Sequence, residues 1–147
     1  MEITAITSEH ELWQRTICFA SGCSWRGGHY LSDAMRNGSF HGWERVFVAV
    51  DNGQIAGFCT LTEKDEMSEK YDFRPFIGSV FVDEFYRGSR LSGKLIDEVS
   101  HYASKYGFEK VYIMSGEVGL YEKYGFTFFG MYDTIYGSVE QLFVRNT

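Results

Sequence analysis

The stretch VFVDEFYRGSRLSGKLI, residues 80–96, joins the end of an apolar strand to a polar turn and the start of an amphipathic helix. The first backbone N–H groups of a helix have no partner within it, and the helix dipole adds partial positive charge there. A pyrophosphate fits this geometry. Arg87 and Arg90 add charge, Gly88 permits close backbone approach, and Ser92 offers a hydroxyl. These residues alone fit a phosphate site and a basic surface turn without a ligand equally well.

The segments on either side of this turn predict alternating strands and helices. An almost unbroken apolar run, FIGSVFV at residues 76–82, is typical of a central strand covered on both faces. After the turn, apolar residues at helical spacing predict a helix over 91–106. Residues 110–114 predict another strand. Residues 117–124 predict about two helical turns, ended by Gly125 as a left-handed residue.

The remaining segments predict a largely antiparallel sheet. Ser8 and Glu11 have the spacing of a reciprocal helix cap, which predicts that a first helix opens there. A second, shorter helix is expected around residues 30–35, and Asn52-Gly53 predicts a tight hairpin. The other strands are expected at residues 2–7, 45–50, 55–62, 126–132 and 139–144. The polar residues 63–74 are expected to form an exposed loop. The order predicts a single α+β domain, residues 1–147, with one parallel strand pair flanking the long helix.

Composition limits the function classes. The net charge of -6 opposes nucleic acid as a partner, since such proteins need a basic surface. No apolar run is long enough to cross a bilayer, and the acidic N-terminal segment does not resemble a secretory leader, so we expect a cytoplasmic protein without a membrane partner. Cys18, Cys23 and Cys59 leave an odd thiol and no CxxC motif, which favours reduced thiols and no metal site.

Two segments together resemble the GNAT superfamily of acetyl-CoA-dependent N-acetyltransferases. The first is residues 80–96, with a strand ending in Val82, a Tyr-Arg-Gly turn and a helix. The second is GLYEKYGF, residues 119–126, about thirty residues downstream. Both have the order and separation that the family requires. The resemblance implies a GNAT-like mixed sheet, flanked by helices, in which the parallel strand pair splays apart to form a slot for acyl-CoA.

The resemblance also implies roles for individual residues. The backbone of Phe81 and Val82 is expected to pair with the pantetheine arm of acetyl-CoA, the co-substrate. Tyr121 is the implied proton donor to the leaving thiolate, and a phenol does remain protonated at neutral pH. A backbone N–H near Val82 is expected to bind the thioester carbonyl oxygen. The N–H groups expected to hold the pyrophosphate are those of Arg87, Gly88, Ser89, Arg90, Leu91, Ser92 and Gly93.

The sequence departs from the family pattern in three places. Arg90 and Ser92 occupy positions where the family usually has glycine or alanine. The asparagine that many members carry after the fifth strand is absent, and MSGEVG takes its place, so that Ser115 or a backbone group is the candidate to substitute for it. The central strand contains no acid that could serve as a general base. Glu63 and Glu117 are the candidates for that role, and each is also a plausible solvated carboxylate.

The function implied by the resemblance is N-acetyltransfer from acetyl-CoA to a primary amine of a small molecule or peptide, by direct attack on the thioester. Two alternatives remain: a non-catalytic acyl-CoA-binding sensor or interaction module with the same fold, and a domain whose turn holds a nucleotide. By this resemblance, the region that tends to line the acceptor pocket contains Trp25, Arg26 and His29. The acidic loop could attract a cationic amine. The oligomeric state is open, with a homodimer among the alternatives.

Overall fold

Seven strands form one sheet in the order β1-β2-β3-β4-β5-β7-β6. The computed structural model describes all residues, 1–147. The strands are β1 (Glu2–Ile6), β2 (Arg45–Asp51), β3 (Gln54–Thr62), β4 (Phe76–Val82), β5 (Lys110–Met114), β6 (Thr127–Asp133) and β7 (Val139–Asn146). Every neighbouring pair is antiparallel except β4 and β5. The predicted α+β class and the single parallel pair are confirmed.

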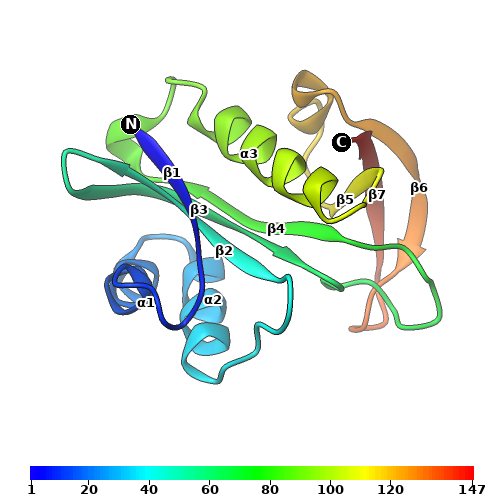
Figure 1. Cartoon of the computed structure of the whole chain (residues 1–147). Helices are drawn as coiled ribbons and strands as arrows, with labels where there is room; N and C mark the ends of the chain where they lie inside the picture. The colour runs from blue at the N-terminus through cyan, green and yellow to red at the C-terminus, as the bar shows by residue number, and fades with distance from the viewer.

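Helices cover both faces of the sheet (Figure 1). Helices α1 (Trp13–Gly22) and α2 (Arg26–Arg36) lie on one face, and α3 (Leu91–Lys105) lies on the other. Two short 3-10 turns complete the chain, η1 (Glu84–Tyr86) before α3 and η2 (Tyr121–Tyr124) before β6. Each face therefore has its own hydrophobic core, the larger one beneath α3 and the smaller one beneath α1 and α2. No helix is both long enough and apolar enough to cross a bilayer.

The parallel strands β4 and β5 pair only at the first residue of β4. Phe76 is opposite Tyr112, and the Tyr112 N–H donates to the carbonyl of Pro75 at 3.0 Å. The strands then diverge, and no further pair joins them. Residues 78–80 are consequently part-exposed although β4 is the middle strand of the sheet. The predicted splayed pair is thus present, and its opening lies beside the second half of β4.

A β-bulge interrupts β4 at this opening. Phe58 is opposite Phe81 and Thr60 is opposite Gly78, so that Cys59 of β3 faces two residues of β4, Ser79 and Val80. Ser79 has a φ of 49°, a left-handed conformation that is uncommon for a residue with a side chain. The bulge directs two residues of the central strand away from regular pairing, at the place where the strands splay apart.

Three local predictions were wrong. The first helix begins at Trp13 without a side-chain cap, because the His10 ring accepts the Leu12 N–H at 3.0 Å and residues before it form turns. The two helical turns expected at 117–124 are reduced to η2, because Gly119 is left-handed with a φ of 81°. Gly125 ends η2 with a φ of 84°, as predicted.

The third wrong prediction concerns the segment between β3 and β4, which is not simply an exposed loop. Met67 is buried and bridges to Thr134, near the end of β6. Its side chain packs with Phe76, Met114 and Leu142 in a small third core. The segment is therefore anchored to the C-terminal part of the sheet.

Candidate active site

A basic cleft of about 940 Å³ opens at the N-terminus of α3 and extends to η2 and β7. One acid, Asp97, lines it, and its carboxylate is paired with Arg145 at 2.7 Å. The basic residues that line the cleft are Arg87, Arg90, Lys94, Lys123 and Arg145. In a chain of net charge -6, this clustering makes the cleft the natural place for a polyanion.

Free backbone N–H groups line the same cleft. In the turn before α3, the N–H groups of Arg87 and Ser89 are bonded to carbonyls of η1 residues, and that of Lys94 is bonded to Arg90. The N–H groups of Gly88 and of residues 90–93 have no acceptor within the protein. Of the seven amides expected to hold the pyrophosphate, those of Arg87 and Ser89 are thus engaged within the protein, and the other five lie free at the positive end of the α3 dipole.

Arg90 fits the turn by adopting the conformation that glycine normally takes. It has a φ of 63° and a ψ of 25°, immediately before the first residue of α3. Its side chain is exposed and lines the cleft without closing it. Arg90 therefore places a positive charge at the cleft in a position where the family pattern has a small residue.

Arg87 contacts the end of the central strand. Its Nε donates to the Val82 carbonyl at 3.1 Å, and its guanidinium lies 5.8 Å from the centre of the Phe81 ring. The backbone of Phe81 and Val82 is the part of β4 expected to pair with pantetheine. The Val82 carbonyl can accept a second hydrogen bond, so this contact leaves it able to pair with a ligand.

Tyr121 lies in the core beneath α3, where its ring packs against Phe126 and Phe143 with 6.0 Å between ring centres. Its side chain is 9% exposed. Burial raises the pKa of Tyr121 to about 12, the charge of Glu117 and the nearby Cys59 thiol act in the same direction, and a hydrogen bond with Ser115 opposes them. The phenol is therefore protonated at neutral pH, and it lies near Cys59, the residue opposite the bulge.

The other residues singled out from the sequence occupy varied positions. Trp25 stacks on Phe81, with ring centres 5.9 Å apart and planes 3° from parallel, on the face covered by α1 and α2. Arg26 and His29 are exposed residues of α2. Glu63 forms an ion pair with Arg74 at 3.2 Å, beside the start of β4 and not at its bulge.

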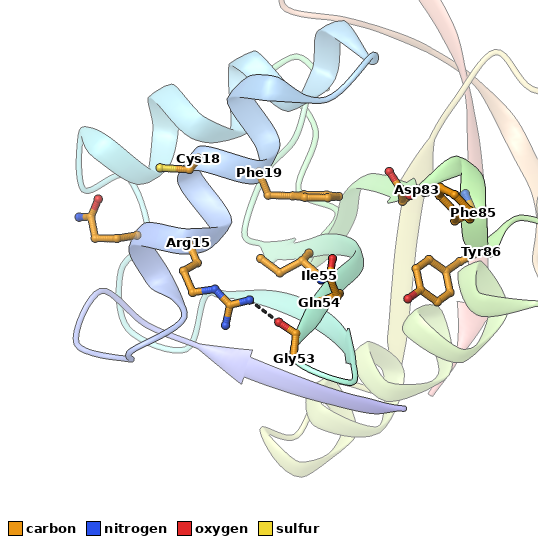
Figure 2. A pocket seen from close by; sticks show the side chains of 10 residues that line it. Arg15, Cys18, Phe19, Gly53, Gln54, Ile55, Asp83, Phe85 and Tyr86 are labelled. Carbon is orange, nitrogen blue, oxygen red and sulfur yellow. Dashed lines mark hydrogen bonds between the residues drawn. The ribbon is translucent and has the colours of Figure 1, made fainter.

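A second cleft, of about 900 Å³, lies between α1, the β2–β3 hairpin and η1 (Figure 2). Sequence analysis did not point to it. Its two charged residues are engaged within the protein: the Arg15 guanidinium donates to the Gly53 carbonyl, and the Asp83 carboxylate accepts the Phe85 N–H at 3.4 Å. Tyr86 borders both clefts, and its hydroxyl donates to Asp51 at 3.1 Å. The basic cleft is thus the one that offers free charges and amides.

The fold, the splayed strands and the basic cleft define an acyltransferase. The sequence profile of the acetyltransferase (GNAT) family matches residues 10–126, and the chain belongs to this family. A search of the curated proteins finds no match.

Solved structures show the same fold. An aminoglycoside 6′-acetyltransferase type Ii aligns with a TM-score of 0.76 at 13% identity, covering 99% of this chain and 97% of that chain. An aminoglycoside 6′-N-acetyltransferase complexed with coenzyme A gives 0.71 at 11% identity, with the same coverage. A GNAT family acetyltransferase from Elizabethkingia anophelis with acetyl-CoA bound gives 0.66 at 16% identity, again covering 99% and 97%.

Several residues that line the cleft or its neighbourhood were not predicted from the sequence. Lys123 lies inside the quoted GLYEKYGF segment and could have been noticed as a charge beside Tyr121. Lys94 lies one turn into α3 on the cleft side, and helical spacing could have suggested it. Arg145 and the bulged Ser79 carry no local signal, since each depends on the packing of distant strands.

Proposed function

We propose that this protein transfers the acetyl group of acetyl-CoA to a primary amine by direct attack on the thioester. The observation that carries the proposal is the set of free amides at the start of α3, in a basic cleft that reaches Val82 at the end of β4. Solved structures of the same fold contain coenzyme A or acetyl-CoA, which supports this co-substrate.

The residues of the cleft fit coenzyme A. Five unpartnered amides, at Gly88 and residues 90–93, suit a diphosphate, and the surrounding lysines and arginines suit its remaining charge. The volume of about 940 Å³ is at the upper end of the range for small-molecule sites. In this proposal the backbone of Phe81 and Val82 pairs with the pantetheine arm.

Two groups would act on the thioester itself. Ser79 and Val80 have no registered partner on β3 or β5, so their backbone N–H groups are the candidates to bind the carbonyl oxygen as negative charge develops. Tyr121 holds its proton on the α3 side of the same place and would donate it to sulfur as the carbon–sulfur bond breaks. The sequence had placed the oxygen-binding amide near Val82, and the bulge favours a position two or three residues earlier.

Aminoglycoside acetyltransferases among the similar structures support a small cationic amine over a peptide as the acceptor. A cytoplasmic location and a homodimer also remain proposals. The edge strand β6 and the β6–β7 connection support the second of these, because several apolar side chains there are about half exposed or more. They are Phe128, Phe129, Met131, Ile135, Tyr136 and Val139.

The proposal is tested with purified protein in two steps. Calorimetric titration with coenzyme A and separately with ATP establishes which ligand the basic cleft binds, and we expect coenzyme A. Acetyl-CoA is then mixed with a panel of primary amines, and free thiol and acetylated amine are both measured. Binding without thiol release across the panel would instead identify a sensor. Preference for ATP would identify a nucleotide site.

A further inference from the structure

A carboxylate lies directly against the central strand next to the bulge. The Asp65 Oδ1 atom is 3.4 Å, and its Cγ atom 3.5 Å, from the point that a Cβ atom at Gly78 would occupy. The Thr60 hydroxyl oxygen lies 3.2 Å from the same point. The carboxylate therefore lies beside the strand at Gly78, one residue before the bulged Ser79. Neither Glu63 nor Glu117 has this position.

This carboxylate lies on the face of the sheet opposite Tyr121. Cys59 and Ile77 belong to the core beneath α3, which also contains Tyr121. Side chains alternate along a strand, so Thr60 and Gly78, the next residues in register, face the side of α1 and α2. An acceptor amine that approaches the opening between β4 and β5 from this side would contact Asp65 first.

No cation in the protein neutralises Asp65. The ion pairs of the structure join other residues, including Glu63 with Arg74 and Lys70 with Asp133. The adjacent Lys64 is held by the carbonyls of Tyr71 and Phe73, at 2.6 and 3.2 Å. The negative charge of Asp65 is therefore available to a cationic ligand.

The surroundings of Asp65 also make it a stronger base than an ordinary aspartate. Burial raises its pKa to about 6, the neighbouring charge of Glu66 acts in the same direction, and a hydrogen bond from the Glu66 N–H opposes them. Thr60 and Gly78, which face it from β3 and β4, do not titrate. A pKa near the working pH is the range in which a carboxylate serves best as a general base.

We propose that Asp65 binds the ammonium group of the acceptor and takes its proton, from the α1 and α2 face, before the amine attacks the thioester beside Ser79. This inference rests on the proposed function and identifies the acceptor as a strongly basic alkylamine. The site would not require Asp65 for an amine that is already neutral.

The protons balance as follows. Asp65 takes one proton from R–NH₃⁺ and later releases it to water. The nitrogen lone pair forms the carbon–nitrogen bond, and the carbon–sulfur bond breaks with its electron pair on sulfur. Tyr121 gives its proton to sulfur, and the second proton lost by nitrogen restores the phenol. The products are the N-acetylated amine, coenzyme A as free thiol and one released proton.

Asp65→Asn tests this proposal, with Asp72→Asn as the matched control, because Asp72 is an exposed aspartate of the same segment. With a basic alkylamine that the wild type acetylates, we expect kcat of Asp65→Asn to fall by about 10²–10⁴-fold. Coenzyme A affinity should stay within about twofold of wild type, because the coenzyme cleft is lined by other residues. Asp72→Asn should match wild type in both measurements.

A second substrate separates proton removal from a structural role. Methoxyamine is neutral at pH 7, so Asp65→Asn should acetylate it at a rate close to that of wild type. Equal loss of activity on both amines would overturn the proposal, as would full activity of Asp65→Asn on the alkylamine. If no amine is acetylated by wild type, the proposed function itself fails, which is a different result.

The wild-type enzyme provides a test that needs no stable variant. Asp65 must be deprotonated to act, so kcat/KM for the alkylamine should decline as the pH falls through about 6. The decline should be absent with methoxyamine at pH values where that amine is neutral. A decline of the same size with both amines would contradict the role of Asp65.

Discussion

The ring of Tyr124 lies so close to Gly93 that a Cβ atom at position 93 would stand 2.9 Å from the Tyr124 Cε1 atom. Gly93 lies in the first turn of α3, and Tyr124 is the last residue of η2. Both elements line the basic cleft, so this contact sets the spacing between its two sides.

Gly93→Ala should weaken coenzyme A binding. The added methyl group must displace the Tyr124 ring or the start of α3, and such overpacking costs about 1–3 kcal/mol. We therefore expect the Kd for coenzyme A to rise by about 5–150-fold, measured by calorimetric titration. Gly22→Ala is the control, because a Cβ atom at Gly22 meets nothing within 4 Å. Adding Tyr124→Ala to Gly93→Ala should recover part of the affinity, and no recovery would argue against this contact.

Arg90 should make two separable contributions, one through its backbone conformation and one through its charge. Its φ of 63° costs about 1–2 kcal/mol for a residue with a side chain. Arg90→Gly should therefore be more stable than Arg90→Ala by about 1 kcal/mol in urea denaturation. Both variants lose the same charge, so both should bind coenzyme A more weakly than wild type. The Kd of each variant for coenzyme A should also change less with salt concentration than that of wild type. Equal stability of the two variants would contradict the strain.

The order of elements, the parallel pair and the free amides of the turn before α3 could be predicted because each depends on local patterns. The run FIGSVFV indicated a central strand, and the Tyr-Arg-Gly turn indicated free amides before a helix. These features follow from hydrophobic spacing and from the geometry of any helix N-terminus. Helix boundaries could not be predicted as closely. The hydrogen bond from the Leu12 N–H to the His10 ring and the left-handed backbone of Gly119 determine where helical structure begins, and hydrophobic spacing shows neither feature.

The position of the acid opposite Tyr121 could not be predicted from the sequence. Asp65 is one of several acids in a polar segment, and only tertiary packing brings it against Gly78. The bulge at Ser79 likewise arises from the register between β3 and β4, which the apolar run does not specify. Burial of Met67 fixes the segment that carries Asp65, and no periodic pattern marks that residue.

Lys123 should bind a phosphate of coenzyme A through its charge alone. It lines the cleft, is exposed, and belongs to none of the ion pairs of the structure. Lys123→Gln should raise the Kd for coenzyme A by about tenfold at low salt, and by less at high salt, because screening weakens the lost attraction. Lys105→Gln, at the far end of α3, is the control and should bind as wild type does. A deficit that is the same at both salt concentrations would contradict a charge effect.

Tyr121→Phe should lower kcat and leave coenzyme A binding unchanged. Phenylalanine keeps the packing against Phe126 and Phe143 and removes only the hydroxyl. Loss of a positioned proton donor lowers rates by about 10²–10⁴-fold, and stopped thiol-release assays at saturating amine measure this directly. An unchanged kcat would remove Tyr121 from the reaction and leave sulfur protonation to water.

The same variant should change how stability depends on alkaline pH. Burial raises the pKa of Tyr121 to about 12, above the value of about 10 for an unfolded tyrosine. The folded state thus holds this proton more tightly, so its contribution to stability is complete below pH 10 and is lost as the pH rises toward 12. Between pH 8 and pH 11, wild type should lose about 1 kcal/mol more free energy of unfolding than Tyr121→Phe in urea titrations.

The other tyrosines with raised pKa values, Tyr86, Tyr102 and Tyr112, are present in both proteins and cancel in this difference. Parallel stability curves for the two proteins would mean that the phenol is not held in its protonated form by the fold.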